Sequence, residues 1–221
     1  MSYFYLYIFI LAIFIIGVSY WNTYHEGFNS EKQTIVLLGD SIFKNDQYVS
    51  HGKSVNQLLS ERTNGKTICL AKNDAKIANV YDQVKQIEPY LNSTTTIIFL
   101  SIGGNDILSH AQNNNNGDNK FLSTVFEEYK SVVKSIQIQL PKANIVLFDI
   151  YYPDNLKYKQ YHPIIREWND MVQTFARDPE NRIRGVFKIS SILTTPEDFT
   201  LEIEPSDVGG QKIVDTILSS Y

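Results

Sequence analysis

Four short runs of apolar residues, each followed by turn residues and a longer helical pattern, constrain the fold of this chain more than any other feature. The runs are Thr34–Leu38, Thr67–Ala71, Thr95–Ser101 and Asn144–Ile150, and a fifth, shorter run lies near Gly185–Ile189. Apolar residues at helical spacing occur in Ser54–Arg62, Ala75–Tyr90, Phe121–Leu140, Ile164–Ala176 and Asp207–Ser219. Such alternation is typical of a parallel sheet covered by helices on both faces. The sequence therefore predicts an α/β fold around a five-stranded parallel sheet.

Composition narrows the class of protein. A chain of 221 residues, 43% of them hydrophobic, is long enough to bury one sizeable core, so one folded domain is expected. The net charge of −4 and the interspersed charges leave no basic stripe, which argues against a nucleic-acid partner. Cys69 is the only cysteine, which excludes an intrachain disulfide and a multi-cysteine metal site. Its apolar neighbours predict a core position.

The first residues form a separate segment. Tyr3 to Trp21 carries no charged side chain, and a helix of this length rises roughly 28 Å, close to the thickness of a bilayer core. We therefore expect a transmembrane anchor over residues 1–21, a polar linker over 22–32 and the folded domain over 33–221. A cleaved signal peptide is the alternative, because Gly17 and Ser19 are small enough for a cleavage site, although no basic residue precedes the run. Lys32 alone does not indicate the orientation of the anchor.

Two polar clusters follow predicted strands at the edge where loops of parallel sheets gather. Gly39–Ile42 (GDSI) follows the first strand, and Gly103–Asp106 (GGND) follows the third. A serine at this edge can act as a nucleophile, and an asparagine amide on the neighbouring loop can donate to a developing oxyanion. Either cluster alone is also what an ordinary turn contains, since Gly, Asp and Asn dominate turns. Two such clusters on adjacent loops favour a site.

With these residues the chain resembles the SGNH (GDSL-type) hydrolase family. Its first motif block is matched by Gly39–Ile42 and its third by Gly104–Asp106, and the likeness continues through Asp46–Leu59 and Glu204–Ile213. The resemblance implies a flavodoxin-like three-layer sandwich, no cofactor or metal, and hydrolysis of ester or acetyl groups on lipids or carbohydrates. It also fits the absence of a GxGxxG or Walker loop after the first strand.

The resemblance also implies roles for individual residues. Ser41 would be the nucleophile, Ser41 N–H and the Asn105 amide would donate to the oxyanion, and Asp40 and Gly104 would support the turns. In the second block the family usually has a glycine, where this chain has Asp74. A backbone N–H survives that change, but the Asp74 carboxylate would repel an oxyanion if it pointed into the site.

The last block departs further from the family. Where the family usually has Asp-x-x-His-Pro, this chain has Leu201–Pro205 (LEIEP), which is similar to a branch of the family with Glu-Pro-Ser in this place. Glu204 thus occupies the position of the usual base, and Leu201 that of the carboxylate that orients it. A glutamate with an ordinary pKa of roughly 4.3 removes a hydroxyl proton poorly unless burial raises that value.

Three routes to a base remain open. Glu204 could act as a desolvated base, Asp198 could orient another group, or a histidine from a nearby loop could enter the site. The candidate histidines are His51, His110 and His162, each of which could equally be a solvated loop residue, while His25 lies in the linker.

Two further groups of residues are candidates for lining a substrate pocket. Tyr151-Tyr152-Pro153 and Trp168-Asn169 are candidates for an acyl pocket, or are core and turn residues. Taken together, the sequence favours a membrane-anchored serine esterase or deacylase with an atypical base. The alternative is a catalytically silent SGNH-like module that binds a glycan or an acyl ligand. Neither reading indicates an oligomeric state.

Overall fold

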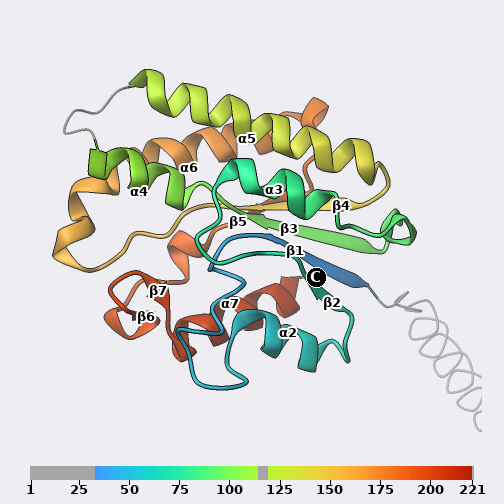
Figure 1. The fold of residues 1–221 in the computed structure, drawn as a ribbon, viewed down its shortest axis with the longest axis horizontal. Helices are drawn as coiled ribbons and strands as arrows, with labels where there is room; N and C mark the ends of the chain where they lie inside the picture. Colours follow the sequence, from blue (N-terminus) through green and yellow to red (C-terminus); the bar gives the residue numbers. More distant parts are fainter. Residues whose placement is uncertain (1–32, 114–118, 221) are drawn as a thin grey trace, which may run out of the picture. The chain divides into compact units, whose positions relative to one another are not determined.

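A parallel five-stranded sheet is the centre of the fold in the structure, a computed structural model that describes residues 33–113 and 119–220. Its strands lie in the order β2–β1–β3–β4–β5 (Figure 1). They comprise β1 (Thr34–Gly39), β2 (Thr67–Cys69), β3 (Thr96–Ser101), β4 (Asn144–Phe148) and β5 (Gly185–Phe187). This confirms the predicted α/β fold with a five-stranded parallel sheet.

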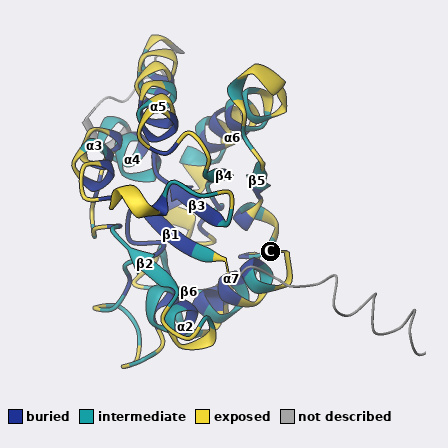
Figure 2. Cartoon of the chain, turned by 90° about the vertical axis from the view of Figure 1, so that its right-hand side faces the viewer, coloured by how far each residue is buried: buried dark blue, intermediate teal, exposed yellow. Residues whose placement is uncertain are grey.

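Alternating side chains of the central strands face two separate apolar clusters. Val36 and Leu38 of β1 pack with residues from α3 (Ile77–Val84), α5 (Asn119–Gln139) and α6 (His162–Arg177). Ile35 and Leu37 pack on the other face with α2 (Val55–Arg62) and α7 (Asp207–Ser220). Helices thus cover both faces of the sheet (Figures 1 and 2), and β1 and β3 are accordingly apolar along almost their whole length.

The helices differ from the sequence prediction at two places. The helix expected over Ala75–Tyr90 ends at Val84, and a 3₁₀ turn follows at Pro89–Leu91. Pro89 holds the preceding residue in an extended conformation and lacks an N–H to donate, so the helix cannot continue through it. An additional helix, α4 (Gly104–Asn113), begins inside the cluster that reads as a turn in sequence.

A small antiparallel hairpin was not predicted. Its strands are β6 (Phe199–Thr200) and β7 (Glu204–Pro205), paired as Phe199 with Pro205 and Thr200 with Glu204. Strands of two residues give no periodic signal in sequence. The hairpin is nevertheless central to the site, because it carries Glu204.

Two other predictions concern the surface and the chain's beginning. Cys69 was expected in the core but is half-buried at the end of β2, where burial still raises its thiol pKa to about 11.

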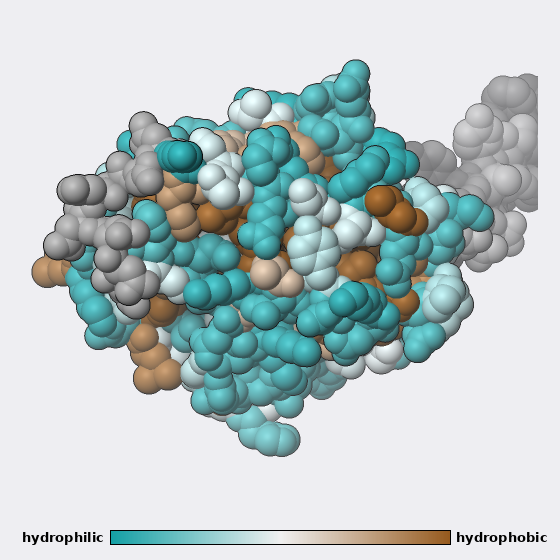
Figure 3. All heavy atoms as spheres, turned by 45° about the horizontal axis from the view of Figure 1, so that its top comes forward, coloured by the Kyte–Doolittle hydropathy of each residue, from teal (hydrophilic) through white to brown (hydrophobic). Residues whose placement is uncertain are grey.

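The predicted anchor and linker lie outside the described residues. Within the described ranges, no helix is long and apolar enough to cross a membrane. The face seen in Figure 3 is mostly hydrophilic with scattered apolar residues, which is ordinary for a folded domain.

Candidate active site

The turn before Ser41 is fixed by the core. Gly39 ends β1 with φ +130°, and a Cβ atom there would lie 1.7 Å from the Ser101 carbonyl oxygen, so only glycine fits. Gly39 N–H donates to Gln83 Oε1 at 2.7 Å, and Gln83 Nε2 donates to the Gly39 carbonyl at 2.8 Å. The Gln83 side chain is fully buried on α3. Sequence analysis missed Gln83, although a polar residue on the buried face of a helix is a signal of this kind.

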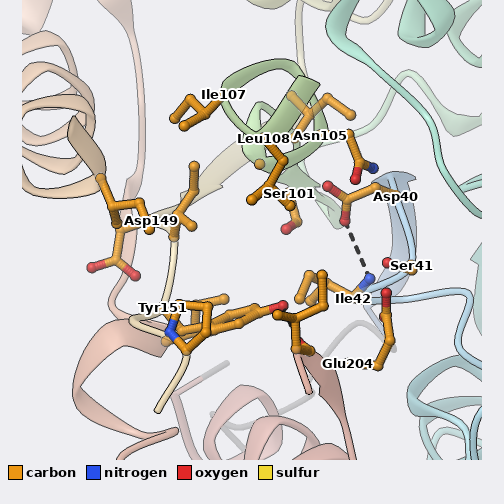
Figure 4. Close-up of a pocket in the computed structure, with 17 residues that line it drawn as sticks. Asp40, Ser41, Ile42, Ser101, Asn105, Ile107, Leu108, Asp149, Tyr151 and Glu204 are labelled. Atoms are coloured by element: carbon orange, nitrogen blue, oxygen red, sulfur yellow. Dashed lines mark hydrogen bonds between the residues drawn. The ribbon is translucent and has the colours of Figure 1, made fainter. Parts of the chain in front are cut away.

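Ser41 and Glu204 approach each other across the site. Ser41 is buried after β1, Glu204 is half-buried in β7, and Figure 4 shows the serine hydroxyl directed at the carboxylate. Burial raises the Glu204 pKa above its ordinary value, and its hydrogen-bonding contact with Ser41 offsets only part of that increase. The buried Oε2 atom of Glu204 has no hydrogen-bond partner within the described part of the chain. This carboxylate is therefore available to accept a proton.

Asp40 lies beside Ser41 as a second buried carboxyl group. Its Oδ1 accepts a hydrogen bond from Ile42 N–H at 3.2 Å, which closes the turn around Ser41 (Figure 4). Burial raises the Asp40 pKa to about 8, and the negative charges of Glu204 and Asp106 act in the same direction. Asp40 is thus largely protonated at neutral pH, so it adds little negative charge near a forming oxyanion.

Asn105 lies in the first turn of α4 and lines the same pocket as Ser41. Its Nδ2 donates to the Ala75 carbonyl at 2.9 Å, which fixes the plane of the amide. An amide nitrogen carries two hydrogens, so one remains for a substrate oxygen. The turn before Gly104 is tight, because Gly103 has φ +114° and a Cβ atom there would lie 2.5 Å from the Trp168 ring.

Asp74 lies outside the pocket lining. Its carboxylate accepts a hydrogen bond from Asn73 Nδ2 at 2.8 Å, its side chain is exposed, and it does not line the pocket. Its backbone has φ 56°, in the left-handed region that favours glycine and tolerates aspartate. The negative charge of Asp74 still contributes to the raised pKa of Glu204.

The three candidate histidines do not line the pocket. His51 is exposed. His110 stacks face to face on Phe121, with ring centroids 3.5 Å apart. His162 contacts a residue of the pocket wall, because its Nε2 lies 3.0 Å from the carbonyl oxygen of Pro153. His25 lies outside the described residues.

Asp198 does not serve as an orienting group for the pocket, the role that the sequence left open for it, but supports a loop. It is fully buried, its Oδ2 accepts from the N–H groups of Thr194 and Thr195, and its Oδ1 pairs with Lys212 Nζ at 2.7 Å. Burial opposes ionisation, but the Lys212 pair and these hydrogen bonds outweigh it and lower the Asp198 pKa. Both oxygens are therefore engaged in supporting the loop before β6.

The pocket itself is narrow and mostly apolar, with a cavity volume of ≈ 60 Å³. Polar groups lie at Asp40, Ser41, Ser101, Asn105, Asp149 and Glu204, and the apolar wall consists of Ile42, Ile102, Ile107, Leu108, Ile150, Tyr151, Pro153, Ile165, Ile189 and Ile203. Such a lining suits an acyl group. The described residues contain no group of three His, Cys, Asp or Glu side chains placed to hold a metal ion.

Only some of the residues that the sequence suggested for an acyl pocket line this one. Tyr151 and Pro153 line it, whereas Tyr152 packs against His162 and Trp168 is fully buried in the core. Asn169 holds the pocket wall from behind: its amide donates to the Ile150 carbonyl at 2.7 Å and accepts from Ile150 N–H at 2.8 Å.

Comparison with known proteins identifies the family. The sequence model of the family described as GDSL-like Lipase/Acylhydrolase matches residues 35–191, which is more than half of the chain. The chain therefore belongs to the GDSL-like lipase/acylhydrolase family, as its motifs predict. No curated protein matches the sequence.

Solved structures share the fold at low sequence identity. A member of the lipolytic G-D-S-L family from Veillonella parvula is 18% identical, with a TM-score of 0.66 over 86% of this chain and 98% of that one. Phospholipase A1 from Streptomyces albidoflavus is 15% identical, with a TM-score of 0.62 over 85% and 98%. A putative platelet activating factor from Streptococcus pneumonia is 16% identical, with a TM-score of 0.60 over 95% and 98%. At these identities the likeness concerns the fold.

Proposed function

We propose that this protein is a membrane-tethered ester hydrolase, an esterase or deacylase, in which Ser41 is the nucleophile and Glu204 the base. The observation that carries the proposal is the Ser41 hydroxyl directed at the half-buried Glu204 carboxylate, in an apolar pocket that Asn105 also lines. Membership of the GDSL-like family supports hydrolysis as the reaction class.

The chemistry follows the usual course of serine acyl transfer. As Ser41 Oγ attacks the ester carbonyl carbon, Glu204 takes the hydroxyl proton, and the carbonyl oxygen becomes an oxyanion. Ser41 N–H and the remaining Asn105 Nδ2 hydrogen donate to that oxyanion. The intermediate collapses, the alcohol leaves with the proton from Glu204, and an acyl-serine remains. Water then attacks the acyl-serine in the same way, which releases the acid and restores Ser41.

Burial makes Glu204 a better base than an exposed glutamate. A base is most effective when its pKa lies near the working pH, and the pKa of Glu204 is raised by burial and by the charge of Asp74. A largely protonated Asp40 complements this arrangement, since an ionised Asp40 would oppose negative charge on both Glu204 and the oxyanion.

The apolar pocket favours the acyl part of a lipid or carbohydrate ester as the buried portion of the substrate. The uncharged run from Tyr3 to Trp21 supports tethering, which would bring the domain to a bilayer. In this proposal the tether supplies location and the described domain supplies the chemistry.

Fluorophosphonate labelling of the full-length protein in detergent tests the proposal, because this probe modifies only an activated serine. We expect labelling of the wild type, none in Ser41→Ala, and slower labelling in Glu204→Gln. A well-folded wild type that does not react would instead favour the catalytically silent module. Undiminished labelling of Glu204→Gln would move the base to another group, with His162 the first to test.

A further inference from the structure

The hairpin that carries Glu204 is too small to define its own conformation. Its two strands have two residues each, and isolated hairpins of even greater length are marginal in water. In the loop between the paired residues Thr200 and Glu204, Leu201 has φ 46° and Glu202 has φ 75°. Both values lie in the left-handed region, which side chains other than Gly, Asn and Asp rarely adopt. Contacts from outside the hairpin must therefore hold this shape.

One such contact comes from the 3₁₀ helix Leu156–Tyr161. The Glu202 carboxylate accepts a hydrogen bond from Tyr158 Oη at 3.1 Å and pairs with Lys157 Nζ at 3.0 Å. Tyr158 is buried, whereas the Lys157 pair is exposed. An exposed ion pair contributes little, so the tyrosine hydroxyl is the more important of the two partners.

Two more contacts hold the residues on either side of Glu204. The Tyr151 hydroxyl donates to the Ile203 carbonyl. On the other side, Asn45 Nδ2 donates to the Pro205 carbonyl at 3.3 Å, while Asn45 Oδ1 accepts from Val55 N–H at 3.0 Å. Asn45 is fully buried and follows Ser41 by four residues. One side chain thus joins the loop of the nucleophile to the residue next to Glu204.

From these contacts we propose that Asn45 and Tyr158 are positioning residues that hold the Glu204 carboxylate against the Ser41 hydroxyl. The inference rests on the proposed function, because it assigns these side chains to the base of that reaction. Neither residue lines the pocket, so neither touches a substrate bound there. Tyr151 contributes to the same support but also forms the pocket wall, and it is therefore unsuited to a test.

Two variants remove one hydrogen bond each. Asn45→Asp keeps the oxygen that accepts from Val55 N–H but cannot donate to Pro205, and Tyr158→Phe removes only the hydroxyl that reaches Glu202. Gln137→Glu is the matched control, because it replaces an amide donor that reaches the Asn181 carbonyl at 2.5 Å from α5, outside the pocket. If burying the new carboxylate of Asn45→Asp prevents folding, Tyr158→Phe still tests the proposal.

The expected kinetic effect is on turnover and its pH dependence. A misplaced catalytic group costs rate rather than affinity, so kcat for a soluble ester should fall about tenfold or more with KM little changed. In Tyr158→Phe, which adds no charge, loosening the hairpin also admits water to Glu204, so its pKa falls toward its ordinary value and the ascending limb of the pH–rate profile moves to lower pH. Gln137→Glu should lower thermal stability without moving that limb.

The decisive experiment repeats Tyr158→Phe and Asn45→Asp in the Glu204→Gln background. Residues that act through Glu204 should have little further effect on kcat once Glu204 is gone, whereas a general structural defect should reduce kcat by the same factor in both backgrounds. Folded single variants with kcat within about twofold of wild type and an unmoved limb would overturn the inference. An undiminished Glu204→Gln enzyme would instead overturn the proposed function, so the two failures are distinguishable.

Discussion

Ser41 and Glu204 face each other in the site, but the protein supports them in different ways. Ser41 follows β1, a strand that pairs with both β2 and β3 in the centre of the sheet. Glu204 lies in β7, a strand of two residues that pairs only with β6 among the described strands. The proposed nucleophile is therefore positioned by the core of the domain. The proposed base is positioned by side chains from several other elements.

This difference separates stability from activity. A change beneath Ser41 alters buried contacts that the whole domain shares, so it should lower the free energy of unfolding. A change around Glu204 affects a small hairpin whose loss leaves the sheet intact, so it should lower activity first. The predictions below test this contrast, in order of decreasing effect.

Gly39→Ala should have the largest effect, because the added Cβ atom would lie 1.7 Å from the Ser101 carbonyl oxygen. We expect the free energy of unfolding to fall by more than about 3 kcal/mol, measured by urea denaturation. Gly104→Ala is the matched control, since a Cβ atom there meets nothing within 4 Å. Equal stability of the two variants would show that the Ser41 turn is not fixed by the core.

Gln83→Leu should come next. It leaves the Gly39 N–H buried without its partner, which costs about 1–3 kcal/mol, whereas the Gly39 carbonyl still accepts from Lys72 N–H at 3.0 Å. Fluorophosphonate labelling of Ser41 should slow as well, because the turn beneath it is loosened. Gln139→Leu, which removes an amide of α5 that donates to the Val84 carbonyl at the end of α3, should leave labelling unchanged. Labelling at the wild-type rate in Gln83→Leu would contradict this role.

Asp40→Asn should change how stability depends on pH. The pKa of Asp40 is raised from 3.8 to about 8 in the folded protein, so the folded state binds this proton more tightly than the unfolded state. Its contribution to stability is therefore full below pH 3.8 and is lost as the pH rises toward 8. Asp40→Asn should remove this loss and raise the melting temperature at pH 8 relative to wild type. Thermal unfolding at pH 5 and pH 8 measures this effect. If the melting temperatures of wild type and Asp40→Asn differ by the same amount at both pH values, Asp40 is ionised throughout this range.

Leu201→Asn should have the smallest effect and the opposite sign. Leu201 has φ 46° and is 65% exposed, and asparagine adopts that backbone conformation more readily, so stability should rise by about 0.5–1 kcal/mol. Leu156→Asn is the control, since Leu156 is 78% exposed without a positive φ. A gain that is equal in both variants would show that it comes from removing an exposed apolar side chain rather than from relief of backbone strain.

The same contrast explains what the sequence could predict. Long apolar strands and the residues that follow them are local signals, so the sheet and the clusters around Ser41 and Asn105 could be found from sequence. The supports of the site are not local. Gln83 binds the backbone of Gly39, 44 positions away, and Asn45 binds the backbone of Pro205, 160 positions away. Both partners are bonded through backbone atoms, so no side-chain pattern in the sequence indicates the contact.

The choice of Glu204 as the proposed base also depended on tertiary structure. Sequence left Glu204 and three histidines as candidate bases, with Asp198 as a group that could orient another, because order along the chain does not show which side chains reach Ser41. The structure directs Glu204 at Ser41, engages both oxygens of Asp198 elsewhere and places the histidines outside the pocket lining.

The most direct test of the central claim is the pH–rate profile of ester hydrolysis by wild type and Glu204→Gln. If Glu204 is the base, wild-type activity rises with pH through a midpoint above 4.5, because the carboxylate must be deprotonated and burial raises its pKa. Glu204→Gln should then lose about 10²- to 10⁴-fold in kcat and lose that limb. A Glu204→Gln enzyme that keeps both its rate and the ascending limb would contradict the account.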